Sequence, residues 1–157
     1  MPTQKITGNK RYVIDTNALV ALVDHRDKWH TTAKAIFSKL DNLEFVPVYF
    51  DCVMNESFSI LGRRAEEQKR LQDVPLMFSD LIAFVPKQEM TWVSKETERL
   101  YDDLVRLVEE TQGKLNFHDA LIALCCREGG LQFIFSFDKD FDDMKWLTRI
   151  SHESDIP

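Results

Sequence analysis

Four acidic residues of this 157-residue chain lie beside apolar stretches or on a helical segment between them: Asp15, Glu56, Asp119 and Asp138. Carboxylates gathered in one place repel each other, by about 4 kcal/mol per pair at roughly 4 Å and an effective dielectric constant near 20. Divalent cations relieve this repulsion, and a ligand set made only of oxygens favours Mg²⁺ or Mn²⁺. Because the sequence has no glycine-rich phosphate loop and no Cys/His cluster, it indicates metal-assisted hydrolysis of a phosphate ester.

The three aspartates also have purely structural explanations. Asp119 follows Asn116, a good N-cap residue, and an acid in the first turn of a helix suits the helix dipole. Asp15 could cap a helix that starts directly after it, and Asp138 could belong to a turn. The catalytic interpretation therefore depends on whether the fold brings the acids together.

Glu56 has a competitor on the same predicted helix. On a helical wheel it lies opposite the apolar stripe that includes Phe58, which is typical of a solvated residue. Cys52 and Ile60 lie on its own side of the helix, so that face is not plainly polar. Asp51, which lies beside Phe58 on the wheel, could serve instead, and helical geometry leaves the choice open.

The elements that would position these acids alternate along the chain. Short β-branched or aromatic segments predict strands at residues 11–15, 45–49, 90–93, 133–135 and 147–150. Helical spacing predicts helices at residues 16–23, 29–40, 51–61, 64–83, 95–110 and 117–128, with Gly62 ending one and Pro75 breaking another. This alternation predicts an α/β fold with a mainly parallel, doubly wound sheet, which binds ligands beyond the carboxyl ends of its strands. Asp15 and Asp138 would share that edge.

Length and composition limit the class of protein. The chain is long enough for one domain, expected at residues 11–150, with flexible tails at 1–10 and 151–157. Its net charge of −6 argues against a generally basic nucleic-acid binder but allows a local basic face. The three cysteines lack zinc or disulfide spacing, and no apolar run is long enough to span a membrane. We therefore expect a cytoplasmic protein without membrane contact.

Four segments in this order resemble the PIN-domain ribonucleases: VIDTN at 13–17, NES at 55–57, HDALIA at 118–123 and SFDKDF at 136–141. The likeness is greatest to the small single-domain members, which include the VapC-type toxins. It implies an α/β/α sandwich around a central four- or five-stranded, mainly parallel sheet. It also implies an acidic site that holds Mg²⁺ or Mn²⁺.

The resemblance implies roles for individual residues. Four carboxylates match the acids of the family's site and would hold the metal: Asp15, Glu56, Asp119 and Asp138. Asp140 lies close to the last of these and could take part. Asn17 and Ser136 match polar positions that support the ligands, although threonine is more usual at the second position.

The implied activity is that of a metal-dependent endoribonuclease, which could be the toxin of a toxin–antitoxin pair. Its partners would be an RNA substrate and an antitoxin protein, and we expect a homodimer. Arg63 and Arg64, at the end of the predicted Glu56 helix, are candidate RNA contacts. His118 is interpreted as a packed or capping residue, because nothing in the family pattern requires it.

Two other functions fit parts of the sequence. A catalytically weak RNA-binding or scaffold module could keep the same fold, although the four intact acids argue against it. A phosphatase of the haloacid dehalogenase type would need a second aspartate two residues after Asp15, where this chain has Asn17. Chelator-sensitive cleavage of a labelled RNA would separate a nuclease from a binding module.

Overall fold

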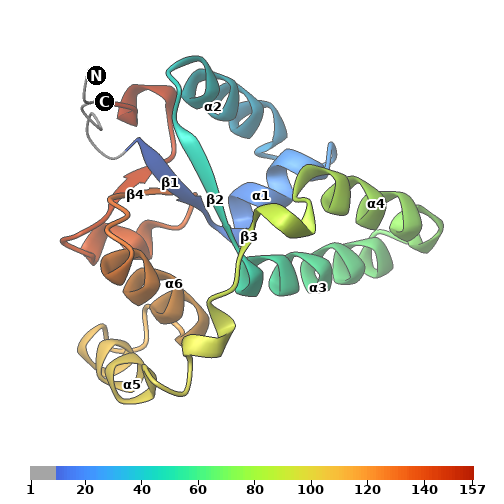
Figure 1. The fold of residues 1–157 in the computed structure, drawn as a ribbon. Helices are drawn as coiled ribbons and strands as arrows, with labels where there is room; N and C mark the ends of the chain where they lie inside the picture. The colour runs from blue at the N-terminus through green and yellow to red at the C-terminus, as the bar shows by residue number, and fades with distance from the viewer. Residues whose placement is uncertain (1–9) are drawn as a thin grey trace.

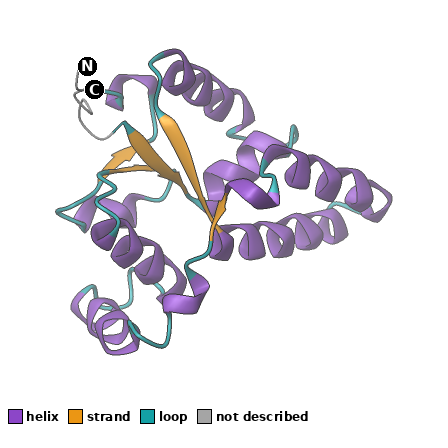
Figure 2. Cartoon of the chain, viewed as in Figure 1, coloured by secondary structure: helices purple, strands orange, loops and turns teal. Residues whose placement is uncertain are grey.

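The computed structural model describes residues 10–157, which fold around one five-stranded sheet (Figures 1 and 2). The strands are β1 (Arg11–Ile14), β2 (Val46–Phe50), β3 (Met90–Thr91), β4 (Phe133–Phe135) and β5 (Thr148–Ile150). Their order is β3-β2-β1-β4-β5, and every neighbouring pair is parallel. The predicted α/β fold is confirmed, with five strands. Residues 1–9 of the predicted N-terminal tail lie outside the described residues.

Six α-helices cover the sheet within residues 10–157: α1 (Thr16–Val23), α2 (His30–Asn42), α3 (Asp51–Glu67), α4 (Val74–Phe84), α5 (Tyr101–Glu110) and α6 (Phe117–Glu128). Helices α1 to α4 pack together, and α5 packs against α6 (Figure 1), which gives the α/β/α arrangement. Short 3₁₀ segments η1 (Leu71–Asp73), η2 (Lys87–Glu89), η3 (Ser94–Glu96), η4 (Lys139–Asp143) and η5 (Glu153–Asp155) lie between and after them. No helix in this described part of the chain is long and apolar enough to cross a membrane.

The centre of the sheet is also the point where the strand order reverses. The chain moves from β1 to β2 and β3 on one side and returns to β4 and β5 on the other. Ile14 of β1 is in register with Phe135 of β4, and both side chains are fully buried. The residues that follow these two strands therefore emerge next to each other. Crevices at such switch points are the usual ligand sites of open parallel sheets.

Helix α6 packs into the core, as its apolar sequence predicts. Residues 120–126 are all buried, and the helix ends before Gly129. At its other end the side chain of Asn116 caps the first turn by accepting a hydrogen bond from the backbone N–H of Asp119. The first turn is thus held at the carboxyl edge of the sheet, beside the end of β1.

Helices α3 and α4 differ from the prediction. α3 continues through Gly62 to Glu67, because Leu61 and Ala65 are fully buried on its inner side. Their packing outweighs the roughly 1 kcal/mol that glycine costs inside a helix. Pro75 starts α4 instead of breaking a helix, since a first-turn residue needs no intrahelical N–H partner. The break lies earlier, where Lys69 adopts a positive φ of 53°.

Helix α5 starts at Tyr101, later than the predicted start at residue 95. The chain before it is held as a separate 3₁₀ turn, η3. The carboxylate of Asp51 accepts hydrogen bonds from the backbone N–H groups of Val93 (2.6 Å) and Ser94 (3.1 Å). This long-range contact fixes the approach to η3 and occupies the carboxylate that competed with Glu56 for the site.

Residues 151–157 form part of the folded domain, which corrects the flexible tail predicted there. Ile156 is only 9% exposed and joins the core. The backbone N–H of Ser151 donates to Oδ2 of Asp155 (2.9 Å), and Nζ of Lys39 on α2 donates to the carbonyl of Glu153 (2.7 Å). A single aliphatic side chain among polar neighbours shows no periodicity, so this packing leaves no pattern in the sequence.

Candidate active site

Asp15 lies at the end of β1 with both carboxylate oxygens engaged. Its side chain is buried, Oδ1 accepts from the backbone N–H of Thr16 (2.8 Å), and Oδ2 accepts from Oγ of Ser136 (2.6 Å). Burial raises the pKa of Asp15 to about 6, although the two hydrogen bonds act against the rise. Asp15 therefore caps α1, as the structural explanation proposed, and also faces the end of β4.

Ser136 and Asn17 join the ends of β1 and β4. The fully buried hydroxyl of Ser136 donates to Asp15 and accepts from the backbone N–H of Asp138 (3.0 Å) and from Nδ2 of Asn17 (3.3 Å). Oδ1 of Asn17 accepts from the backbone N–H of Phe137 (3.0 Å). The two side chains thus orient Asp15 and the loop that carries Asp138.

Glu56 points from α3 toward the end of β1. Its Oε2 accepts from Oγ1 of Thr16 (2.8 Å) and lies 2.7 Å from Nε2 of His118. The close contact with His118 is the main reason why the pKa of Glu56 falls below its ordinary value, and the hydrogen bond from Thr16 adds to the effect. Oδ1 of Asp51 accepts hydrogen bonds from the backbone before η3, so Glu56 stays the predicted ligand of the two.

Asp119 lies in the first turn of α6, and three other carboxylates affect its pKa. Its pKa rises to about 7, first because it is buried and then because of the negative charges of Asp15, Asp138 and Glu56. The positive charge of His118 acts in the opposite direction. Together the four acids form one group, here called the acidic cluster, at the carboxyl edge of the sheet.

Asp138 and Asp140 have different surroundings in the loop after β4. Asp138 caps η4, and its Oδ1 accepts from the backbone N–H of Asp140 (2.9 Å). Asp138 is among the main charges that raise the pKa of Asp119. The structure therefore brings Asp138 into the acidic cluster and gives the backbone of Asp140 the role of supporting it.

The sequence matches the family model described as the PIN domain over residues 12–147. The chain belongs to the PIN-domain family. Among solved structures, the fold is similar to that of VapC20 from Mycobacterium tuberculosis, described as a toxin that cleaves the sarcin–ricin loop. The TM-score is 0.64 at 23% sequence identity, and the match covers 83% of this chain and 92% of VapC20. No curated protein matches the sequence.

Sequence reasoning missed two polar residues at the site of this PIN domain. His118, interpreted as packed or capping, forms an ion pair with Glu56. Burial lowers the pKa of His118, but the contact with Glu56 and the charges of Asp119 and Asp15 outweigh it and leave the pKa raised. Thr16 holds the same carboxylate from α1. The available signal was their position, since each directly adjoins one of the predicted acids.

The two arginines predicted to contact RNA have different surroundings. Arg64 is held by an ion pair with Asp27 and by Asp24, 3.8 Å away. It therefore fastens the loop between α1 and α2 to the far end of α3, and its role as an RNA contact stays a prediction. Arg63 is exposed, and its positive charge contributes to the lowered pKa of Glu56. Arg63 thus remains a candidate contact beside the acidic cluster.

The acidic cluster suits a hard divalent cation in ligand type and charge. Among residues 10–157, no three His, Cys, Asp or Glu side chains are already arranged as a metal site. Burial raises the pKa of Asp15 and of Asp119, and repulsion between the carboxylates adds to the rise. Carboxylate oxygens are the ligands that Mg²⁺ and Mn²⁺ prefer. Rotation of these side chains would have to complete the coordination.

Proposed function

We propose that this PIN-domain protein is a metal-dependent endoribonuclease that hydrolyses RNA phosphodiesters at the acidic cluster. The observation that carries the proposal is the convergence of four carboxylates at the switch point of the sheet, where burial and repulsion raise the pKa of Asp119 to about 7. A protein seldom gathers buried negative charge without a cation or a proton to balance it. Membership of the PIN-domain family supports the same activity.

The residues in and around the acidic cluster would have different roles in the reaction. We infer that Asp15, Asp119 and Asp138 hold Mg²⁺ or Mn²⁺, with Glu56 and Asp140 as additional ligands. When bound, the cation would supply Lewis-acid stabilisation of the charge that develops on the phosphate oxygens. Ser136 and Asn17 orient the carboxylates through the hydrogen bonds described above. His118 neutralises and positions Glu56.

Cleavage of labelled RNA tests this function. Because VapC20 is described as cleaving the sarcin–ricin loop, an RNA that contains this loop is a suitable first substrate. We expect cleavage with Mn²⁺ or Mg²⁺, none with excess chelator, and none by the Asp15→Asn protein that stays folded. RNA binding without metal-dependent cleavage would instead identify a catalytically weak RNA-binding or scaffold module.

We also propose that the protein acts as the toxin of a toxin–antitoxin pair. The similarity of its fold to that of a toxin supports this role. A protein antitoxin would block RNA access to the acidic cluster. Co-expression with the product of a short adjacent gene should restore growth that the protein alone arrests. If expression of the active protein leaves growth unchanged, the toxin role is wrong while the nuclease activity can stand.

A homodimer is the assembly we propose. Three exposed apolar side chains of η1 and α4 support it: Leu71 (60% exposed), Leu76 (66%) and Ile82 (55%). A second copy of the chain packed against η1 and α4 would bury such exposed apolar side chains. Light scattering should give the mass of a dimer, and Leu76→Asp should reduce it to that of a monomer. A monomeric mass for the wild type would contradict the assembly.

A further inference from the structure

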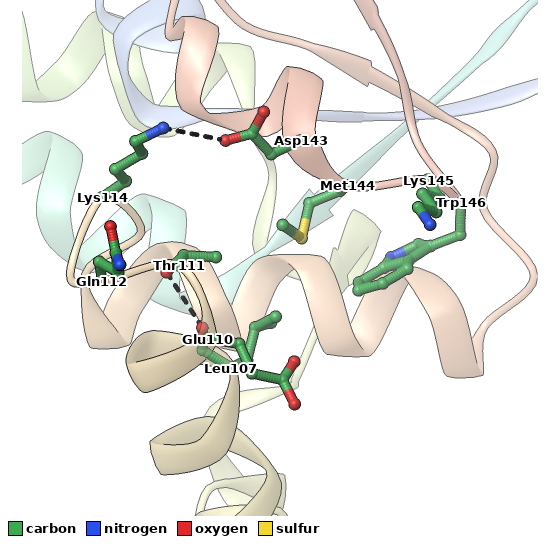
Figure 3. Close-up of a pocket in the computed structure, with 9 residues that line it drawn as sticks. All are labelled: Leu107, Glu110, Thr111, Gln112, Lys114, Asp143, Met144, Lys145 and Trp146. Atoms are coloured by element: carbon green, nitrogen blue, oxygen red, sulfur yellow. Dashed lines mark hydrogen bonds and ion pairs between the residues drawn. The ribbon is translucent and has the colours of Figure 1, made fainter.

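Three adjoining cavities surround Trp146 on the side of the molecule formed by α5 and α6. The largest, about 490 Å³, lies between the end of α5 and the segment that leads into β5 (Figure 3). The others have volumes of about 180 Å³ and 430 Å³. Trp146 lines all three, Leu107 lines the first two, and Lys145 lines the first and third. We call these three cavities together the Trp146 groove.

The apolar wall of the groove is held firmly in place. Nε1 of Trp146 donates a hydrogen bond to the carbonyl of Ala123 on α6 (2.8 Å). The guanidinium of Arg127 lies 5.1 Å from the centroid of the indole, within the range of a cation–π contact. Leu107 and Met144, which also line the largest cavity, are less than 10% exposed. A ligand would therefore meet a preformed surface.

The groove carries more free positive than free negative charge. Lys114 pairs with Asp143 (3.5 Å) at one end, and a second pair joins two residues of α5. Neither Lys145 nor Arg127 forms an ion pair in the described part of the chain, and they face one unpaired acid, Glu110. On a protein of net charge −6, this is a small local excess of positive charge.

Two short chain segments connect the largest cavity of the groove to residues of the acidic cluster. Lys114 lies two residues before Asn116, which caps the helix that carries Asp119. Asp143 is the last residue of η4, which starts directly after Asp138. Five residues of 3₁₀ helix span roughly 10 Å, at about 2 Å per residue. A strand of RNA that places a phosphate at Asp138 can therefore continue into the groove.

We propose that the Trp146 groove binds the single-stranded segment of the RNA substrate that flanks the cleaved phosphodiester. A base would pack against the apolar wall at Trp146 and Met144, and Lys145 and Arg127 would contact phosphates. Aromatic surface next to unpaired cations is the usual composition of single-strand binding grooves. A groove for a protein helix would instead present a continuous apolar strip. The proposal rests on the ribonuclease function and names its substrate path.

Fluorescence anisotropy with a labelled single-stranded RNA tests the groove, using proteins that also carry Asp119→Asn to prevent cleavage. We expect Lys145→Ala and Arg127→Ala each to weaken binding several-fold. Each should also reduce the slope of log affinity against log salt by about 0.7, the value for one lost phosphate contact. Lys34→Ala, an exposed lysine of α2, is the matched control and should change neither quantity.

A second pair of variants isolates the aromatic ring. Trp146→Phe and Trp146→Leu both remove the hydrogen bond to Ala123, so both share its stability cost, but only phenylalanine keeps a ring. We expect the leucine variant to bind RNA at least about five-fold more weakly than the phenylalanine variant. Equal affinities for the two would show that no base stacks there.

Kinetics separate failure of the groove from failure of the ribonuclease function. In the otherwise wild-type protein, Lys145→Ala should raise KM for a long RNA several-fold and leave kcat within about two-fold. If the wild type cleaves RNA and the variants behave identically, the groove is not the substrate path but the enzyme assignment stands. If the wild type neither binds nor cleaves RNA, both proposals fail. Variants that alter only self-association would identify a protein interface and overturn the RNA assignment.

Discussion

Replacement of Asp119 by asparagine separates a metal ligand from a helix cap. In the folded chain the pKa of Asp119 rises from 3.8 to about 7, because the group is buried among other carboxylates. The folded chain therefore holds this proton more tightly than the unfolded chain. The corresponding stability is present below about pH 4 and is lost as the pH rises to about 7, so at pH 8 the ionised carboxylate destabilises the fold.

The size of the effect follows from the same pKa values. Their difference corresponds to about 4 kcal/mol, which we halve to about 2 kcal/mol because Asp119 is partly exposed and solvent screens its charge. The favourable interaction of the charge with the α6 dipole offsets about 0.3–1 kcal/mol. Asp119→Asn should therefore stabilise the metal-free protein at pH 8 by about 1–1.5 kcal/mol. For a domain of this size that raises the Tm by about 2–6 °C.

Metal binding supplies the second half of the test. Mn²⁺ at 100 times its Kd should stabilise the wild type by about 2.7 kcal/mol, or about 5–10 °C in Tm. Asp119→Asn should lose most of this shift and all RNA cleavage. The cap itself should survive, because Asn116 accepts its hydrogen bond from the backbone N–H of residue 119 and not from the side chain.

Thermal melts at pH 8 and near pH 4, with and without Mn²⁺, measure these effects. The difference between variant and wild type should shrink toward zero near pH 4, where Asp119 is protonated in the folded protein. Asp102→Asn, at an exposed acid in the first turn of α5, is the matched control, because it removes a charge from a helix start outside the acidic cluster. A lower Tm for Asp119→Asn at pH 8, or an undiminished Mn²⁺ shift, would refute the reasoning.

Five further substitutions probe the surroundings of the acidic cluster. Asp138→Asn should reduce RNA cleavage far more than Asp140→Asn in single-turnover assays, and the reverse order would mean that the loop presents the other carboxylate. Ser136→Ala should destabilise the fold by about 1–3 kcal/mol in urea and slow cleavage, because the buried Oδ2 that it hydrogen-bonds loses its donor; unchanged stability would show that water replaces the hydroxyl. Arg64→Gln should lower the free energy of unfolding by about 1 kcal/mol without changing RNA affinity, whereas Arg63→Gln should do the opposite.

Much of the fold could be predicted because its signals are local. The β-branched run before Asp15 and the aromatic run before Ser136 are short, and each ends at a polar residue. Parallel strands place their carboxyl ends at one edge, so these residues had to emerge together once the alternation of strands and helices was recognised. The buried apolar helix α6 was equally visible, since residues 120–126 contain no polar side chain.

Boundaries were less predictable because packing outweighed local preference. Gly62 resembles a helix stop, yet α3 continues through it because Leu61 and Ala65 are buried. Pro75 resembles a helix break, yet it starts α4. The C-terminal residues show no apolar period, yet Ile156 fills a place in the core. In each case a contact with a distant element decided the outcome.

By itself the sequence determined the α/β class, the edge of the sheet that carries the acids and three of the four carboxylates gathered there. Only the tertiary structure bound Oδ1 of Asp51 to the chain before η3, paired His118 with Glu56, and joined Arg64 to the loop between α1 and α2. The physical reason is the distance in sequence between the residues that determine each feature. Strand ends and apolar periodicity depend on residues that are adjacent in sequence. The partner of a long polar side chain depends instead on which elements, distant in sequence, pack next to it.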